Sequence, residues 1–413
     1  MRELFQNAGF RRLWASVVTL SLGDALMQMS LLELFHRYHY DERVQTAKLL
    51  FAVALPGLLF GPVAMAYLDR WQRRTVLLVS DGFRALVVGG IAAWLWRLQG
   101  RMSEPHLLVI YALIFLIGTV AAFYLPARVA LLPNLVPKPL LMRANTLFTS
   151  SIAVASIGGR ALGGFVAERF GPMTGVLANT AAYGLSVLWL SGIRMWPHAT
   201  SRDVAGRATS GWVELRTGMA YLWRHGLALR LVCVAGAFAF IGGLVLVEMV
   251  GYAMDTLGLG TGGVGYLIGA GGLGAAAGLA ICARSPVWAR SNGLTPALLT
   301  LVGAALLAMG ATQRVWLAVP LVMALGAAGA MTAIHVDTKL QEHLEETRRG
   351  AVFATRGMLT SLATVLAFWL QFGTALLTQT PPPVVLRGLG AAALAGGGLA
   401  LLATRARLNR TRR

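Results

Sequence analysis

Six charged side chains lie between and within two apolar segments in the stretch AYLDRWQRRTVLLVSDGFRAL, residues 66–86. They are Asp69, Arg70, Arg73, Arg74, Asp81 and Arg84. A short connection cannot spread such charges apart, so each is expected to find a polar or oppositely charged partner nearby. The cluster could hold parts of the fold together, or its arginines could only set the orientation of the chain in a membrane. For Arg74 we predict the second role.

A second set of ionisable residues lies inside apolar segments, where a charge is costly and usually marks a functional site. Asp24 lies in the middle of LSLGDALMQMSL, and Gln28 shares its helical face one turn on. We predict that Asp24 carries a proton or contacts a cation. The alternative is a structural hydrogen bond from Asp24 to a neighbouring helix.

Four further charged residues belong to this set: Arg160, Glu248, Asp337 and Arg356. Arg160, in IGGRALGG, could pair with Asp24 or with Glu248, bind an anionic substrate, or extend its charged end toward the membrane surface. Asp337 and Arg356 lie near the ends of two apolar segments. We expect simple solvation at the membrane surface, with a second paired cluster as the alternative.

The elements that must position these residues are apolar helices. The chain has 413 residues, of which 56% are hydrophobic and 13% charged, with a mean hydropathy of +0.65. Soluble domains carry about 25% charged residues. Segments long enough to cross a bilayer recur throughout, and in lipid such segments must satisfy their own backbone hydrogen bonds as helices. We predict twelve spans, near 12–35, 45–68, 75–96, 106–127, 143–166, 172–193, 227–250, 262–283, 293–312, 315–337, 352–377 and 384–404.

The distribution of Lys and Arg supports this count. One alternate set of loops holds about three times as many of these residues as the other, which places both termini and the central loop in the cytoplasm. The net charge of +19 therefore indicates orientation in a membrane rather than binding of nucleic acid.

The longest connection divides the chain into six spans and six spans. We expect an N-terminal bundle over 1–194, a cytoplasmic linker over 195–226 and a C-terminal bundle over 227–413. In the linker, Trp212, Leu215, Met219 and Leu222 share one helical face, which predicts an amphipathic helix on the membrane surface. NTLFTSS at 145–151 and RGMLTSL at 356–362 are a faint trace of an internal repeat.

The loop MAYLDRWQRR resembles the signature of the major facilitator superfamily, Gly-x-Leu-Ala-Asp-Arg-x-Gly-Arg-Arg. It keeps Asp69, Arg70, Arg73 and Arg74 in register and departs at both glycines, which are Met65 and Gln72 here. The following Ser80, Asp81, Arg84 and Ala85 are similar to the efflux-type branch that includes macrolide and siderophore exporters. The resemblance covers essentially the whole chain. It implies an all-α membrane fold of twelve helices in two pseudo-symmetric six-helix bundles.

The resemblance also implies roles for particular residues. In the family this loop latches the two halves in the outward-facing state, which assigns a gating role to Asp69, Arg70, Arg73, Asp81 and Arg84. Asp337 and Arg356 would be the counterpart in the second half. Glu248 would line the central cavity. Arg160 stands where related antiporters carry proline, and the fourth span lacks the mid-span arginine of many proton-coupled relatives.

These observations lead to three functional hypotheses. The first is a secondary active exporter in the cytoplasmic (inner) membrane. It would use alternating access and the proton gradient to move an amphipathic small molecule such as a drug, macrolide or siderophore. The second is a lipid carrier of the lysophospholipid flippase type. The third is a membrane receptor or scaffold that no longer transports.

The sequence contains none of the motifs that we sought for nucleotide binding, zinc-dependent hydrolysis or serine-based hydrolysis. There is no phosphate-binding Gly-x-x-x-x-Gly-Lys-Ser/Thr loop, no His-Glu-x-x-His motif and no serine in a nucleophile elbow. We therefore expect no enzymatic activity, no cofactor, no metal and no nucleic-acid partner. The expected partners are the substrate, membrane lipid and protons, with the protein acting as a monomer.

Overall fold

The computed structural model describes residues 2–68, 71–98, 101–193, 211–285, 291 and 293–411. Within these ranges the secondary structure is helical, and twelve helices are long and apolar enough to cross a membrane. The protein is therefore an all-α integral membrane protein, as predicted. Asp69, Arg70, the last residue of the predicted N-terminal bundle, 194, and the first part of the predicted linker, 195–210, lie outside the described residues.

The predicted spans correspond one to one with these helices. The first six are α2 (Ala8–Arg37), α3 (Glu42–Leu68), α4 (Arg73–Leu98), α5 (Glu104–Leu135), α6 (Leu141–Phe170) and α7 (Pro172–Ser191). The second six are α9 (Gly226–Gly251), α10 (Thr261–Arg284), α12 (Leu294–Ala311), α13 (Val315–His343), α14 (Glu346–Gly373) and α16 (Pro382–Thr411). Short elements complete the order: α1 (Arg2–Gln6), η1 (Lys138–Leu140), α8 (Gly211–Arg224), the π turn η3 (Tyr252–Thr256) and α15 (Ala375–Gln379).

Several helices extend beyond the predicted spans: α5 continues to Leu135, α13 to His343 and α16 to Thr411, whereas the predictions end at 127, 337 and 404. The predicted span 352–377 ends as a helix at Gly373, because Thr374 adopts an extended backbone and α15 then starts a separate short helix. Glycine has the weakest helix propensity apart from proline, which favours an end at this position.

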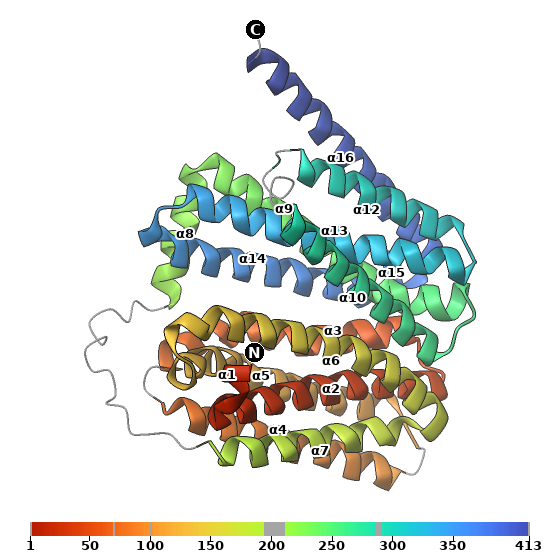
Figure 1. Ribbon diagram of the computed structural model, residues 1–413. Coiled ribbons are helices and arrows are strands. Elements are labelled where there is room, and N and C mark those ends of the chain that lie inside the picture. The colour runs from red at the N-terminus through yellow and green to blue at the C-terminus, as the bar shows by residue number, and fades with distance from the viewer. Residues whose placement is uncertain are drawn as a thin grey trace. The chain divides into compact units, whose positions relative to one another are not determined.

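The chain divides into two compact units (Figure 1). Unit 1 comprises 1–40 and 49–214, and unit 2 comprises 41–48 and 215–413. In unit 1, α2 packs against α6 and α7, while α4 packs against α5 and α7. In unit 2, the pairs are α12 with α16, α10 with α13, and α9 with α14. The first residues of α3 thus belong to unit 2, although the rest of that helix belongs to unit 1.

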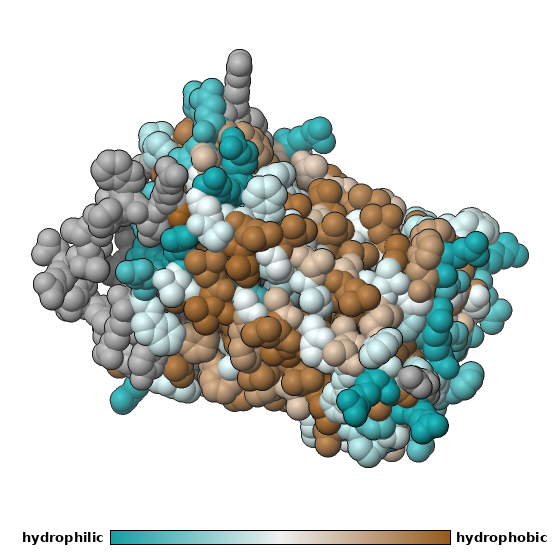
Figure 2. All heavy atoms as spheres, turned by 90° about the horizontal axis from the view of Figure 1, so that it is seen from below, coloured by the Kyte–Doolittle hydropathy of each residue, from teal (hydrophilic) through white to brown (hydrophobic). Residues whose placement is uncertain are grey.

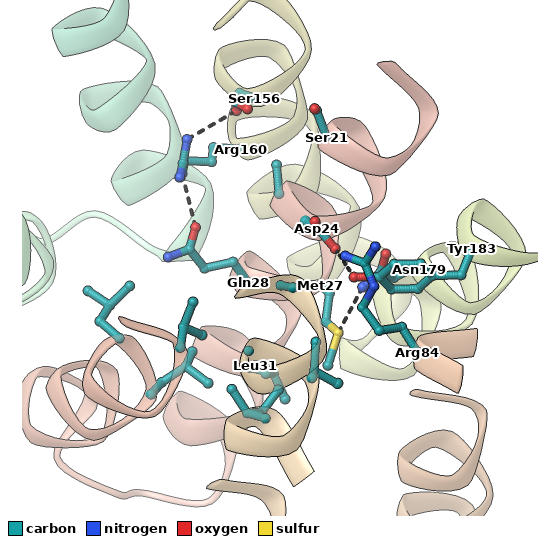
Figure 3. Close-up of a pocket in the computed structure, with 18 residues that line it drawn as sticks. Ser21, Asp24, Met27, Gln28, Leu31, Arg84, Ser156, Arg160, Asn179 and Tyr183 are labelled. Carbon is teal, nitrogen blue, oxygen red and sulfur yellow. Dashed lines mark hydrogen bonds between the residues drawn. The ribbon is translucent and has the colours of Figure 1, made fainter. Parts of the chain in front are cut away.

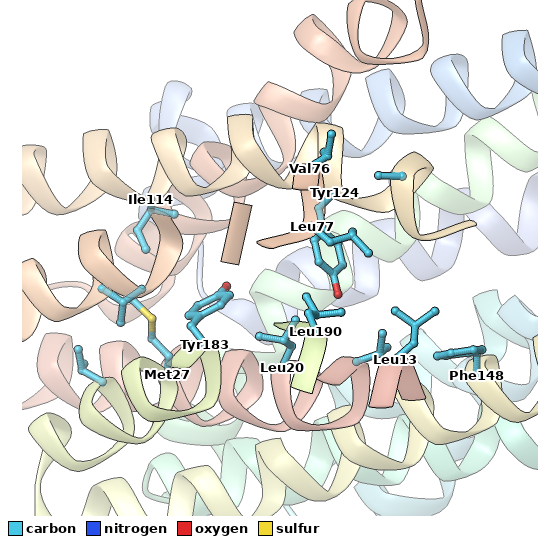
Figure 4. Close-up of a cluster of buried hydrophobic side chains, with 14 of the residues drawn as sticks. Leu13, Leu20, Met27, Val76, Leu77, Ile114, Tyr124, Phe148, Tyr183 and Leu190 are labelled. Atoms are coloured by element: carbon cyan, nitrogen blue, oxygen red, sulfur yellow. The ribbon is translucent and has the colours of Figure 1, made fainter. Parts of the chain in front are cut away.

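Close packing in unit 1 depends on glycines of α6. A Cβ on Gly159 would lie 2.7 Å from the Cβ of Ala25, and one on Gly163 would lie 3.0 Å from the Cα of Leu26. The backbones of α6 and α2 therefore approach closely, as the small residues of IGGRALGG predict. Figure 4 shows the apolar side chains that fill the interior of unit 1, contributed by α2, α4, α5, α6 and α7.

The outward surface of unit 1 is apolar, as a lipid-facing surface must be. Figure 2, seen from the side of α7 in Figure 1, shows hydrophobic residues across the middle of the visible face and hydrophilic residues toward its ends. Exposed apolar side chains of the outward helices include Val79 and Leu86 of α4 and Leu185 and Leu188 of α7.

The linker helix α8 packs through the predicted face, on which Leu215 and Met219 are partly buried, but that face lies against protein. Leu222 is buried, but Trp212 is exposed, and the close contact is made by Gly218. A Cβ on Gly218 would collide with the Ala351 carbonyl and the Thr355 hydroxyl of α14. The helix therefore packs on protein through Gly218, which a pattern of apolar residues alone does not reveal.

Replacing Gly218 with valine is expected to destabilise the protein by about 1–3 kcal/mol, because the added methyl groups force α8 away from α14. Gly357→Ala is the matched control, since nothing lies within 4 Å of a Cβ at Gly357. Thermal unfolding in detergent measures both. A Gly218→Val protein as stable as the wild type would show that the α8–α14 contact is dispensable.

Candidate functional site

Unit 1 encloses a cavity of about 380 Å³. Its polar lining comes from α2, α4, α6 and α7, and its apolar lining comes mainly from α2, α3 and α5. The polar residues are Ser21, Asp24, Gln28, Arg84, Ser156, Arg160, Asn179 and Tyr183 (Figure 3). Three predicted residues, Asp24, Gln28 and Arg160, therefore line one cavity, and a fourth, Arg84, joins them. The volume lies at the lower end of the range of small-molecule sites.

Asp24 lies where α2 meets α7. The hydroxyl of Tyr183 donates a hydrogen bond of 2.8 Å to Asp24 Oδ1. Gly23 permits this approach, because a Cβ there would lie 2.6 Å from both Ala182 Cβ and Asn179 Oδ1. The structural alternative for Asp24, a bond to a neighbouring helix, is thus present. Its role with protons or cations stays a prediction.

Asp81 and Arg84 form a buried ion pair in unit 1. The hydroxyl of Ser186 on α7 also donates to Asp81. The guanidinium carbon of Arg84 lies 4.5 Å from the ring centre of Tyr124 and 4.8 Å from that of Tyr183. The described partners of this pair therefore join α4 to α5 and α7 within one unit, and its gating role stays a prediction.

Arg73 and Arg74 bind the carboxyl-terminal parts of two other helices. Arg73 Nη1 donates to the carbonyl of Ala130 at 2.7 Å. Arg74 donates from Nε to the carbonyl of Leu190 and from Nη2 to that of Ser191, the last residues of α7. Cations stabilise helix carboxyl ends. The prediction that Arg74 serves only membrane orientation is therefore wrong, because it also caps α7.

Arg160 extends from the middle of α6 toward Gln28 of α2. Its Nε–H donates to Gln28 Oε1 at 3.0 Å, and its Nη1 lies 3.5 Å from the carbonyl of Ser156 (Figure 3). The described ion pairs do not include Arg160, so the predicted pairing with Asp24 or Glu248 is not found among the described residues.

Glu248 lies in unit 2 and is not among the described residues that line the cavity. Its Oε2 is 3.2 Å from Arg43 Nη1, and neither side chain is appreciably exposed. Arg43 also donates to the carbonyls of Thr378 and Thr380, at 2.7 and 2.8 Å. Arg43 could not be identified from the sequence, because a single arginine beside an apolar span resembles any other loop charge.

Asp337 of α13 and Arg356 of α14 form an ion pair, and the Asp337 side chain is 40% exposed. The alternative given for these two residues, a paired cluster, is therefore the arrangement present in unit 2. Whether it acts as a counterpart of the gating cluster stays a prediction.

Two units of six long apolar helices, with a cavity in one of them that has both polar and apolar lining residues, define a helical membrane transporter. The chain belongs to the Major Facilitator Superfamily, whose sequence profile matches residues 13–368.

Three relatives illustrate the range of this similarity. The uncharacterised MFS-type transporter YfiS of Bacillus subtilis is 26% identical over 243 residues, 58% of this chain and 55% of that protein. The multidrug efflux pump Tap of Mycobacterium tuberculosis is 28% identical over 178 residues, 42% of this chain and 41% of Tap. The matched stretch thus spans about half the length of these two relatives. The lysophospholipid transporter LplT of Klebsiella pneumoniae is 25% identical over 388 residues, 90% of this chain and 89% of LplT.

Solved structures agree on the fold. A bacterial homologue of the iron transporter ferroportin, in its inward-facing state, aligns with a TM-score of 0.68 at 17% identity. The alignment covers 96% of this chain and 97% of that one. A point mutant of the nucleoside transporter NupG aligns with a TM-score of 0.72 at 10% identity, covering 97% of this chain and 99% of that one.

Proposed function

We propose that the protein is a proton-coupled exporter of an amphipathic small molecule in the cytoplasmic membrane. It would act as a monomer by alternating access, with both termini in the cytoplasm. The observation that carries this proposal is the cavity of unit 1, where a polar side with Asp24, Gln28 and Arg160 faces apolar residues of α3 and α5. The similarity to the efflux pump Tap supports export.

Asp24 is the proposed proton carrier because it connects the cavity to a buried charge network. Arg84 is paired with Asp81 and also interacts electrostatically with Asp24, so one cation influences two carboxylates. Protonation of Asp24 would leave a neutral Arg84–Asp81 pair, and loss of that proton would leave one excess negative charge. Such a change can bias the packing of α2 against α4 and α7, which is the kind of local event that drives a conformational switch.

Proteoliposomes with the pH-sensitive dye pyranine inside test this proposal. Addition of an amphiphile, either ethidium or 8-anilinonaphthalene-1-sulfonate, is expected to change the internal pH when the wild-type protein exchanges it for protons. Asp24→Asn is expected to lower the initial rate at least about tenfold, because one titratable group is lost from the pathway. Glu104→Gln removes an exposed carboxylate from the start of α5, outside the cavity, and should behave as the wild type.

Two results would contradict the proposal: wild-type protein that binds these amphiphiles without moving protons, or an Asp24→Asn variant that retains the full rate.

Lipid transport is a second candidate, favoured by an alignment with LplT that covers nearly the whole chain. The same apolar wall could hold an acyl chain. Transfer of a fluorescent lysophospholipid across the proteoliposome membrane without a change of internal pH would favour this candidate over proton-coupled export.

A further inference from the structure

We infer that the molecule bound in the cavity of unit 1 carries an anionic group, a carboxylate or phosphate, and that the guanidinium of Arg160 binds it. The inference deepens the proposed function, on which it rests, by naming the chemical class of the substrate.

The position of Arg160 is the first observation. An arginine in the middle of a membrane helix is costly and is retained where it has a partner or a ligand. Arg160 lines the cavity and is only partly exposed. Its partners in the structure are both neutral, the Gln28 side chain and the Ser156 carbonyl. Among the described residues, no carboxylate lies within the 4.0 Å of an ion pair with Arg160.

The charge balance of the cavity is the second observation. Arg84 also lines the cavity, but it is paired with Asp81 and lies close to the rings of Tyr124 and Tyr183. Asp24, the carboxylate of the lining, receives the hydroxyl of Tyr183 and the electrostatic influence of Arg84. Asp24 and Arg160 are therefore the charges of the lining for which the described ion pairs supply no counterion, and Arg160 is the cation of the two.

The geometry of the guanidinium is the third observation. Arginine has five N–H donors in a planar fork. Gln28 takes the Nε–H at 3.0 Å, while the Nη1 contact with Ser156 is at the outer limit of a hydrogen bond. Gln28 thus orients the group and leaves donors of the Nη pair for a ligand. Paired N–H donors match carboxylate and phosphate oxygens, which bind arginine in a bidentate manner.

The rigid base of Arg160 suits such a site. Gly159 and Gly163 hold the backbone of α6 against α2 on either side of Arg160, in close contact with Ala25 and Leu26. The opposite wall is apolar and includes Val53 of α3 and Ile114 and Ile117 of α5. A ligand with an anionic group at α6 and an apolar body against α3 and α5 would match both walls.

A cationic substrate at Asp24 is the competing assignment. It would place a positive ligand beside Arg160, which has no counterion among the described ion pairs, and against one carboxylate that already accepts from Tyr183 and interacts with Arg84. The cavity therefore favours an anion over a cation of equal size.

Calorimetric titration of the full-length protein in lipid nanodiscs tests the inference with 1-naphthyl phosphate and its uncharged counterpart 1-naphthol. The wild type is expected to bind the phosphate more tightly, and Arg160→Gln to weaken that binding at least about tenfold, the usual effect of losing a charged hydrogen bond. Binding of 1-naphthol should be the same in both. Arg160→Lys should recover only part of the affinity, because it keeps the charge and loses the fork.

Arg97→Gln is the matched control, since it removes one exposed cation of unit 1 that does not line the cavity. Displacement of 1-naphthyl phosphate by lysophosphatidic acid would indicate a lipid headgroup as the natural anion, whereas no displacement would indicate a soluble acid. Either result is compatible with the inference, provided that binding depends on Arg160.

Equal affinity of the wild type and Arg160→Gln for 1-naphthyl phosphate would overturn the inference, as would tighter binding of 1-naphthylmethylammonium than of the phosphate. These outcomes are independent of the proton-movement assay. A protein that binds anions through Arg160 and moves no protons would refute the proposed coupling and leave this inference standing.

Discussion

Replacing Arg84 with methionine is expected to lower the free energy of unfolding by about 3–5 kcal/mol, the usual cost of removing one partner of a buried ion pair. Asp81 has no exposed surface and would lose its cation. The contacts of the guanidinium with Tyr124 and Tyr183 would be lost as well.

Unfolding in mixed micelles of increasing denaturing detergent measures this effect. The double variant Arg84→Met/Asp81→Asn should recover much of the loss, because the buried carboxylate is then replaced by a neutral amide that still accepts from Ser186. Arg97→Gln is the control for removal of an exposed cation. If Arg84→Met were as stable as Arg97→Gln, the pair would contribute nothing and its role would have to be sought in function alone.

Replacing Arg43 with methionine is expected to have an effect of the same size in unit 2. Glu248 is fully buried, and Arg43 is the cation at ion-pair distance from it. The variant also deprives the carbonyls of Thr378 and Thr380 of their donors. Unpaired buried groups of these kinds carry the full cost of desolvation.

Glu248→Gln separates the two contributions to that effect. It removes the buried negative charge and leaves Arg43 bonded to both carbonyls, so its loss of stability should be smaller than that of Arg43→Met. The double variant Arg43→Met/Glu248→Gln should be more stable than Arg43→Met alone. Unfolding in detergent of the wild type, the two single variants and the double variant provides the coupling energy between Arg43 and Glu248. If the losses of stability in the two single variants added up to the loss in the double variant, the pairing would be contradicted.

The twelve spans could be predicted from sequence because each consists of a long apolar run whose length is set by the bilayer. Asp24 and Gln28 could be placed on one face for a similar reason, since a four-residue spacing is one helical turn. These inferences use local spacing only.

Contacts between distant helices could not be predicted in this way. The pairing of Arg43 with Glu248 joins residues 205 positions apart, and that of Arg160 with Gln28 joins residues 132 apart. Arg74 was interpreted as an orientation signal because loop arginines usually are, and only the fold shows the end of α7 beside it. The packing of α8 on α14 could not be predicted because its closest contact is Gly218, a glycine, which has no apolar side chain to detect.

The assignment of residues 41–48 to unit 2 has a consequence for recombining this protein with its relatives. A chimera joined at the central linker would keep Arg43 of one parent and Glu248 of the other, so the exchange is compatible only where both parents carry this charge pair. A fragment beginning at Leu215 would bury Glu248 without its cation. The two linear halves of the chain therefore cannot be exchanged independently of each other. Unit 2 includes residues 41–48, which belong to the N-terminal half of the sequence.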